Sequence, residues 1–529
     1  MAGHVTQKLS AQHLPLLTSL LLAALSGGCT LGPDFKKPDA PTATGYTPQP
    51  LSTEKTGASQ KYNATAAIPF DWWTLFHSPE LNSLIERAFK ANPTIQSAQA
   101  TLHRMQQNVI AQEGFFYPTV GAGYSPSRNK LAGNNGGNAY GLQANGQSIN
   151  TYTNSAGPTF VKPVYYNYHI SQITVGYMPD IFGINRRQVE SLQAQLNEQR
   201  FQVEATYITL ASNVVAAALQ EASLRSQIVA MQKIIELSSE NLDIMRKQFK
   251  LGFVSTIDVA SQESAQAQAE QALIPLNKQL EQTRDLIRAL AGNLPSEDVP
   301  EKFELASLHL PQELPLSLPS QLVEQRPDIR AAQEQLHSAS AQVGVSVASR
   351  LPQFSITGIM GGMASTPNWM FQQGGGFFSL LGNISETLFD GGTLKANERA
   401  ARERLVQASA DYRNVVIVAF QNVADTLHAI QSDGDSLKAA TQSEQALKVA
   451  AEITRKQYNL GYVSYQMVLL AEQSHQQSLI NLIQAKTNCF GDTAALYQAL
   501  GGGWWNRPDA PARTDLTASL ASPNEKRAP

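Results

Sequence analysis

Hydrophobic residues recur along the longest uninterrupted part of the chain with the period of a coiled coil. From Gly183 to Leu251 no proline and no further glycine occurs, and a single helix of that length would extend for about 100 Å. Within it, apolar residues follow one another at spacings of 3, 4, 7, 3 and 4: Ile228, Met231, Ile235, Leu242, Met245 and Phe249. This spacing predicts the buried seam of a long helix.

Four other segments alternate apolar residues with small or polar ones, which is the period of half-buried strands. They cover residues 117–124, 169–177, 353–360 and 376–388. A polar segment, residues 128–168, separates the first two, and a glycine-rich connection, residues 364–375, separates the last two. We therefore predict two strand-loop-strand inserts.

Beyond residue 29 the chain has no run of roughly 18 to 20 consecutive apolar residues, the length that a membrane-spanning helix needs. If the protein crosses a bilayer, it is therefore expected to do so as a closed barrel. Four strands are too few, because closure takes about eight or more. Several copies of the chain would have to contribute strands.

The chain also contains an internal duplication. Residues 246–255 recur as residues 455–464 with seven of ten positions identical, and residues 93–103 resemble residues 327–337. Each half has the order helix, proline, non-helical insert, long helix, glycine motif and long helix.

Gly252 and Gly461 stand between two helical runs in their respective halves. A left-handed residue that ends a helix is most often glycine, so we predict a helical hairpin turning at each. Ser255 and Ser464 follow, and are expected to N-cap the returning helices. Pro275 predicts a kink or break in the first of these helices.

The first residues have the layout of a secretory signal, residues 1–28, in which Lys8 precedes an apolar run that ends in small residues. Cys29 is the predicted lipid-attachment residue, acylated as the first residue of the mature chain. An ordinary signal-peptide cysteine is the alternative, because Ser26 stands where lipoprotein signals prefer leucine. Cys489 is expected to be a small buried residue.

The composition argues against nucleic acid as a partner, since the net charge is −3 and 16% of residues are charged. Glu472 and His475 have the Glu-x-x-His spacing of a di-iron site, but the second copy and further glutamates that such a site needs are missing. No nucleophile motif, phosphate-binding glycine loop or zinc-type cluster occurs either. We expect no enzyme, no catalytic residue, no metal and no cofactor other than a covalent lipid.

Short motifs along the mature chain resemble those of the TolC-like, NodT-type outer-membrane efflux factors. In order, they are Cys29-Thr-Leu-Gly-Pro-Asp-Phe35, Trp72-Trp73-Thr-Leu-Phe76, Asp180-Ile-Phe-Gly183 with Arg186 and Arg187, Arg326-Pro-Asp-Ile-Arg330, Leu388-Phe-Asp-Gly-Gly392, and Ala495-Leu-Tyr-Gln-Ala-Leu-Gly-Gly-Gly-Trp504. Each is weak alone, and together they are specific.

The resemblance implies an α+β membrane protein that forms a homotrimer. Each protomer would give four strands to one twelve-stranded β-barrel and its coiled-coil hairpins to a periplasmic α-barrel. The expected parts are a signal peptide (1–28), a lipidated extended segment (29–77), a first repeat (78–292; strands and loop 117–178, tip 252–255), a linker (293–318), a second repeat (319–503; strands and loop 352–389, tip 461–464) and a loose tail (504–529). The loops 128–168 and 364–375 would face outward.

The implied function is the exit duct of a tripartite efflux system in the outer membrane of a Gram-negative bacterium. It would passively conduct drugs or other toxic compounds from a periplasmic adaptor and an inner-membrane pump, expected to be proton-driven. The alternatives are the outer-membrane channel of a protein secretion system and a pore-less coiled-coil lipoprotein scaffold.

The hairpin tips would contact the adaptor through the residues beyond each glycine. These residues are Phe253, Val254 and Ser255, and Tyr462, Val463 and Ser464. The alternative is that the aromatic side chains fold back onto their own helices.

Members of the resembled family close the duct near the second tip through rings of ionic contacts. Here Leu470 and Gln473 stand where the family often has Asp and Arg, so the gate is expected to differ. The hypothesis is a constriction built from Leu470, with Asp258 or Glu472 as the remaining charges.

Overall fold

The computed structural model describes residues 30–42, 45–47, 60–63, 66–131, 143–144, 147–148, 164–316 and 319–507. The predicted signal peptide, Cys29 and most of the predicted tail lie outside the described residues. The chain divides into two compact units. The sheet unit comprises Met1–Lys36, Gln106–Gln195 and Leu336–Gln407, and the helical unit comprises Lys37–Met105, Leu196–Gln335 and Ala408–Pro529.

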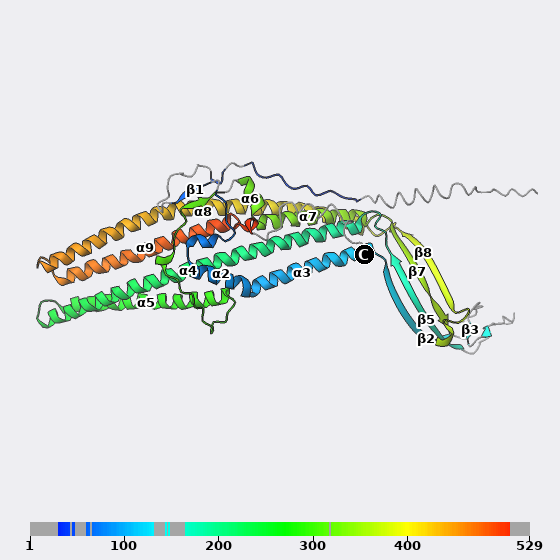
Figure 1. The fold of residues 1–529 in the computed structure, drawn as a ribbon, viewed down its shortest axis with the longest axis horizontal. Coiled ribbons are helices and arrows are strands. Elements are labelled where there is room, and N and C mark those ends of the chain that lie inside the picture. The colour runs from blue at the N-terminus through cyan, green and yellow to red at the C-terminus, as the bar shows by residue number, and fades with distance from the viewer. Residues whose placement is uncertain are drawn as a thin grey trace, which may run out of the picture. The chain divides into compact units, whose positions relative to one another are not determined.

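Long helices account for most of the described chain (Figure 1). Their bounds are α2 Pro79–Ala91, α3 Pro93–Glu113, α4 Ile184–Lys250, α5 Thr256–Leu290, α6 Pro319–Gln325, α7 Pro327–Ala348, α8 Thr393–Asn459 and α9 Tyr465–Ala499. Helices α4 and α8 have 67 residues each, and α5 and α9 have 35 each. The order of the helices and the lengths of the two longest thus recur in the two halves.

Prolines occupy two different positions in the helices. Helix α2 begins at Pro79 with Ser78 as N-cap, whose side chain accepts a hydrogen bond from the Leu81 amide, which is the usual use of a serine before a proline at the first helical position. The break predicted at Pro275 is wrong, because α5 continues through it. A proline removes one hydrogen bond of the ladder, and the rest of a 35-residue helix keeps its own.

Three residues of the predicted α4 seam, Ile228, Leu242 and Met245, are buried, and Met231 and Ile235 between them are half-buried. Phe249, in the last turn of α4, is exposed. The seam therefore loses its cover at the end of the hairpin.

Four strands form one antiparallel sheet in the order β2-β5-β7-β8. Their bounds are β2 Thr119–Leu131, β5 Val164–Tyr177, β7 Gln353–Ala364 and β8 Gly376–Ser385. The predicted polar loop is shorter than expected, because residues 128–131 and 164–168 pair with each other as strand. Backbone hydrogen bonds hold this ladder where the side chains lack an apolar alternation. Strand β8 ends before the predicted residue 388.

Several short elements lie in segments predicted to be extended or loose. A parallel pair joins β1 (Lys61–Asn63) to β6 (Glu313–Pro315), a two-residue pair joins β3 (Gln143–Ala144) to β4 (Gln147–Ser148), and Trp72–Phe76 form a 3-10 helix. The predicted loose tail is wrong at its start. Trp504 Nε1 donates to the Gln325 carbonyl at 2.7 Å, which holds this part of the chain on α6.

Aromatic side chains from distant segments meet in the core of the helical unit. Trp72 stacks on Tyr497 at 5.4 Å between ring centroids, and Phe76 lies against Phe490. Arg284 is buried and donates to the carbonyls of Val299 and Glu301 at 2.6 Å. The start of the predicted linker is thereby fixed to α5.

Candidate functional site

The sheet has one apolar face and one face on which most residues are small or polar. Directly opposed residues of antiparallel strands point to the same face. One face contains the registered rows Ala122, Ile173, Met360, Phe378 and Val120, Val175, Gly358, Leu380. The other contains the row Gly121, Thr174, Ile359, Ser379.

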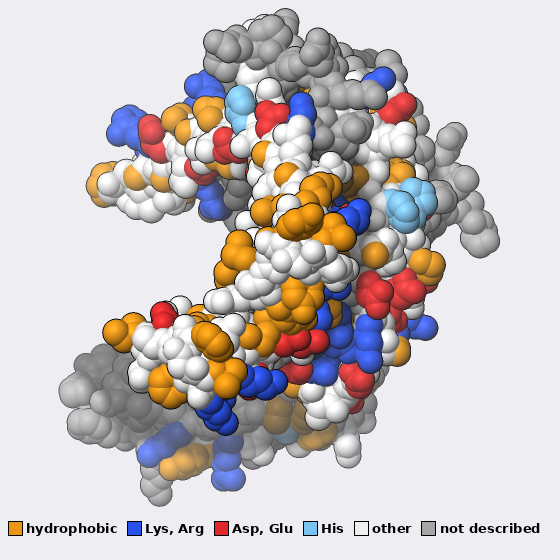
Figure 2. Space-filling view, turned by 90° about the vertical axis from the view of Figure 1, so that its left-hand side faces the viewer, with side chains coloured by type: hydrophobic (Ala, Val, Ile, Leu, Met, Phe, Trp, Pro, Cys, Tyr) orange, Lys and Arg blue, Asp and Glu red, His pale blue; other side chains and the backbone are white. Residues whose placement is uncertain are grey.

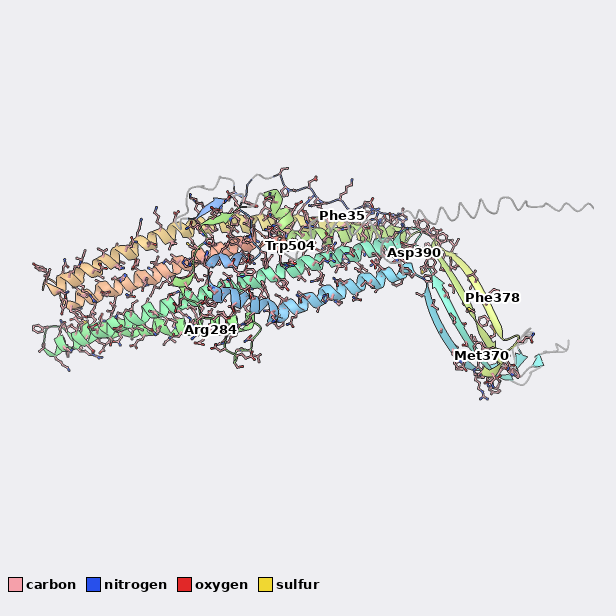
Figure 3. The ribbon with its side chains drawn as sticks, in the orientation of Figure 1. Phe35, Arg284, Met370, Phe378, Asp390 and Trp504 are labelled. Carbon is pink, nitrogen blue, oxygen red and sulfur yellow. The ribbon has the colours of Figure 1, made fainter. Side chains whose placement is uncertain are left out.

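The apolar face is exposed in the single chain. Phe378, labelled in Figure 3, has 86% of its surface accessible, and Val120, Met360 and Leu380 are also exposed. Near the loops, the Tyr124 hydroxyl lies 2.8 Å from His169 Nδ1 on this same face. An exposed apolar face bounded by aromatic residues indicates contact with a nonpolar phase rather than water.

Two aspartates start the long helices that follow the strands. Asp180 accepts hydrogen bonds from the amides of Asn185 and Arg186, both at 2.9 Å. Asp390, labelled in Figure 3, accepts from the amides of Gly392 and Leu394 at 2.8 and 2.7 Å. These backbone hydrogen bonds lower the pKa of Asp390. A carboxylate at a helix N-terminus satisfies amides that the helix leaves unpaired.

Both hairpins turn as predicted. Gly252 has φ +78° and Gly461 has φ +81°, values that favour glycine over other residues. The next amide, Phe253 or Tyr462, donates at 2.9 Å to a carbonyl five residues earlier, on Gln248 or Gln457. Each long helix therefore ends in a Schellman motif.

Apolar side chains at both tips project into solvent. Phe253 and Tyr462 are each 78% exposed, so the structure does not show them folded back as cap contacts. Leu251 and Leu460 are exposed beside them. Figure 2, which looks onto this end of the hairpins, shows hydrophobic side chains among Lys and Arg.

The returning helices begin differently. Ser255 accepts from the Asp258 amide, and an Asp258 carboxylate oxygen accepts from the Ser255 amide at 2.8 Å, which completes a capping box. Hydrogen bonds from Ser255 lower the pKa of Asp258. Ser464 is the N-cap residue of α9 as predicted, but its side chain makes no cap hydrogen bond. Met467 stands where Asp258 does and cannot complete the box.

Each hairpin is closed by an equivalent ion pair. Arg246 lies 2.8 Å from Glu263 in the first, and Arg455 lies 3.2 Å from Glu472 in the second. Glu472, a gate candidate, is therefore paired within its own hairpin.

Helix α9 is joined to α4 by two hydrogen bonds near the tips. Gln473 Nε2 donates to Ser238 Oγ at 2.9 Å, and the Tyr465 hydroxyl donates to Glu240 at 2.9 Å. The second bond raises the pKa of Tyr465. Leu470 lies on α9 between these contacts and is 43% exposed. We call the two hydrogen bonds the α4–α9 links.

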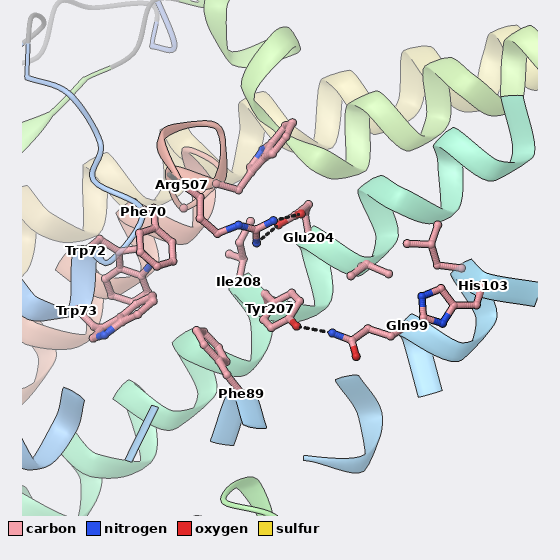
Figure 4. Close-up of a pocket in the computed structure, with 14 residues that line it drawn as sticks. Phe70, Trp72, Trp73, Phe89, Gln99, His103, Glu204, Tyr207, Ile208 and Arg507 are labelled. Carbon is pink, nitrogen blue, oxygen red and sulfur yellow. Dashed lines mark hydrogen bonds and ion pairs between the residues drawn. The ribbon is translucent and has the colours of Figure 1, made fainter. Parts of the chain in front are cut away.

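A cavity of about 620 Å³ lies in the helical unit (Figure 4). The rings of Phe70, Trp73, Phe89 and Tyr207 line it edge to face, with successive centroids 5.8, 5.5 and 5.1 Å apart. At one side Arg507 pairs with Glu204, with N–O distances of 2.8 and 3.0 Å. Both residues line the cavity. Their opposite charges therefore compensate each other there.

The residues that the structure describes lack two further features. Within them, no group of three or more His, Cys, Asp or Glu side chains could hold a metal ion. No described helix has the length and hydropathy of a membrane span.

A family profile described as outer membrane efflux protein matches residues 84–293 and 318–502. The chain belongs to the outer membrane efflux protein family. The resemblance seen in the motifs is confirmed, and with it the efflux function and the outer-membrane location in a Gram-negative bacterium. The family role is that of a channel rather than an enzyme.

Individual efflux proteins match over nearly their whole length. The probable efflux pump outer membrane protein TtgC of Pseudomonas putida is 25% identical, over 96% of this chain and 99% of TtgC. OprJ of Pseudomonas aeruginosa is 25% identical, over 92% of this chain and 96% of OprJ. The similarity therefore extends over nearly the whole length of both proteins in each pair.

Solved structures share that fold. The outer-membrane channel OprN superposes with a TM-score of 0.75 at 24% identity, covering 90% of this chain and 100% of OprN. The CmeC channel of Campylobacter jejuni superposes with a TM-score of 0.78 at 21% identity, covering 93% and 98%. The arrangement of helical hairpins and a four-stranded sheet is thus the fold of this efflux protein.

Three residues of the efflux protein's two α4–α9 links have no signal in the sequence pattern. Ser238, Glu240 and Tyr465 were assigned no role, although Tyr465 opens α9 directly after a motif that was recognised. Its partner Glu240 lies 225 positions away in the sequence, and no local pattern joins two such residues.

Proposed function

We propose that this efflux protein is the passive exit duct of a tripartite system and works as a homotrimer. The exposed apolar face of the four-stranded sheet carries the proposal, since water is a poor environment for it. Three copies would supply twelve strands to one closed barrel, with the polar face lining an aqueous path. Helices of the three copies would continue the path into the periplasm.

The exposure of helix α3 supports the proposal that a neighbouring copy packs against it. Its counterpart α7 has Ser338 and Ala341 buried, whereas the equivalent residues of α3, Arg104 and Gln107, are exposed. Within one chain, other segments therefore bury these positions of α7 but leave the equivalent positions of α3 exposed. In the proposed trimer the next protomer covers α3.

The proposed partners follow from the hairpin tips and from the N-terminus of the mature chain. The exposed apolar tips around Gly252 and Gly461 would dock a periplasmic adaptor, which joins the duct to a proton-driven inner-membrane pump. Cys29 would carry an outer-membrane lipid. Relatives are named for toluene, solvent, antibiotic and pyoverdine export, and we propose small toxic molecules as the cargo. No catalytic step is needed, because the pump supplies the energy.

We propose that the closed gate is apolar and is built around Leu470. Its exposed side chain would face its two symmetry copies in the trimer. The α4–α9 links hold α9 against α4, and opening requires that they separate. Asp258 would act on the gate indirectly, by fixing the first turn of α5.

Current through purified protein in planar bilayers tests the duct and its gate together. We expect Leu470→Ala to raise the closed-state conductance several-fold, because a smaller side chain widens the constriction. Asp258→Asn should raise it less, because it weakens the cap rather than the constriction. A closed-state conductance unchanged by both substitutions would refute the proposed gate.

The pKa of Asp258 adds a pH control to the same experiment. A carboxyl whose pKa falls on folding stabilises the fold above its unfolded pKa, and this contribution is lost as the pH falls through the folded value. Since hydrogen bonds donated by Ser255 lower the pKa of Asp258 in the folded protein, the carboxylate is charged and the cap is intact at neutral pH. The effect of Asp258→Asn on conductance should therefore vanish in strong acid, where wild type also lacks the charge.

A further inference from the structure

The segment Leu31–Phe35, which we call the strap, is held by one buried arginine. Arg187 lies in the first turn of α4, and its side chain is 5% exposed. Its Nε donates to the Leu31 carbonyl at 3.0 Å, and its Nη2 donates to an Asp34 carboxylate oxygen at 2.7 Å. Nη1 donates to Glu190 at 2.7 Å. Charge-assisted hydrogen bonds of this kind are among the strongest in proteins.

The strap also lies directly on the backbone of α7. Gly32 has φ +95°, and a Cβ there would come within 2.4 Å of the Gly344 Cα. A Cβ on Gly344 would come within 2.7 Å of the Leu31 carbonyl oxygen and 2.9 Å of Arg187 Cγ. Two glycines are thus required at this contact, one on the strap and one on the helix.

Stacking fixes the far end of the strap. The Phe35 ring, labelled in Figure 3, stacks on His337 of α7 at 4.4 Å between centroids and 15° between planes. His337 Nε2 lies 3.0 Å from Glu190, the same carboxylate that accepts from Arg187. Side chains of α4 and α7 therefore hold both ends of the strap through one connected network.

The position of this network relates it to the membrane. Arg187 follows the end of β5 by ten residues, and α7 ends five residues before β7 begins. The strap is therefore held where strands pass into helices. Leu31 is two residues from Cys29, a separation of at most about 7 Å in an extended chain.

We infer that Arg187, Gly344 and His337 form a seat that fixes the lipid-bearing N-terminus of the mature protein at the membrane-proximal end of α4. The inference rests on the proposed lipid at Cys29 for its purpose, although the seat itself does not need the lipid. A seated N-terminus holds the acyl chains beside the bilayer that the sheet face contacts. Lipid and sheet then act as two linked anchors, and the binding of one raises the effective concentration of the other.

A spin label on Lys36→Cys tests the seat in the full-length trimer. Lys36 is exposed and directly follows the strap. The Cys29→Ser background leaves Cys489 as the other thiol, which is buried and has its pKa raised to about 12 by burial, so it should not take the label. We expect a spectrum typical of an immobilised label. Its accessibility to relaxation agents dissolved in the lipid should correspond to a single, narrowly defined depth relative to the bilayer.

Arg187→Ala should increase the mobile fraction of the label roughly tenfold or more, because several hydrogen bonds to a charged group are lost together. Gly344→Ala should do the same without changing any charge. Arg399→Ala, at an exposed arginine of α8, is the matched control and should leave the spectrum unchanged. Trimer migration on gels confirms that each variant folds. If Arg187→Ala does not fold, Gly344→Ala and His337→Ala carry the test.

If the label stays immobilised and at one depth in both Arg187→Ala and Gly344→Ala, the proposal that these residues fix the N-terminus is refuted. Acyl labelling of the Cys29 protein is a separate arm, since its absence would refute the lipid without affecting the spectra. With the lipid present, Arg187→Ala should broaden the distribution of label depths. An unchanged depth distribution in the lipidated variant would contradict the positioning role.

Discussion

Replacing Phe253 and Tyr462 together with aspartate should abolish efflux in cells while the trimer still assembles in the outer membrane. Both side chains are 78% exposed at the turns and contact little of their own protomer. Buried aromatic anchors at protein interfaces typically contribute about 2 kcal/mol or more each. Six such residues would meet the adaptor in a trimer, so placing six carboxylates there should eliminate docking.

The measurement is the accumulation of a toxic compound in cells that depend on this duct, together with cross-linking of the tips to the adaptor. Lys247→Asp, an exposed change of charge in the last turn of α4, is the control and should retain most transport. Normal transport by the Phe253 and Tyr462 variant would show that the tips do not dock the adaptor. Normal cross-linking without transport would instead locate the defect in opening.

Ile173→Lys should prevent stable insertion into the outer membrane, whereas Thr174→Lys should be tolerated. The two residues are neighbours on β5 and point to opposite faces of the sheet. A lysine facing lipid near the middle of a bilayer costs about 2–4 kcal/mol, and less near the surface. Three copies in a trimer multiply that cost, while a lysine at Thr174 would stay in water.

Heat-modifiable gel migration of the membrane fraction reads out insertion directly. We expect a folded trimer band for wild type and Thr174→Lys, and its loss for Ile173→Lys. Equal folded bands for both variants would mean that the apolar face does not contact lipid. Loss of the band for Thr174→Lys alone would assign the two faces the other way round.

The main elements of the fold were predictable because their signals are local. An uninterrupted apolar period predicted α4, and glycine between two helical runs predicted both turns, where Gly252 and Gly461 have the expected positive φ. Strand extent was less predictable. Residues 128–130 are polar, and their strand conformation depends on backbone pairing with residues 165–167 rather than on a side-chain pattern.

The functional contacts were less predictable because they join distant residues. Ser255 and Ser464 both follow a valine in the repeated motif, but only Ser255 makes a side-chain cap hydrogen bond, in a box completed by Asp258. Arg187 was recognised as part of a motif, but its contact with Leu31 spans 156 positions. Such contacts appear only when packing brings the segments together.

Release of a small dye from liposomes that contain only the purified trimer tests the central claim, a passive duct with a periplasmic gate, most directly. The double variant Tyr465→Phe with Gln473→Ala removes both α4–α9 links and should release the dye at least several times faster than wild type, with no pump, adaptor or energy source present. Tyr462→Phe, a matched change outside the links, should behave as wild type. Dye retained equally by the double variant and wild type, with all proteins inserted as trimers, would contradict the account.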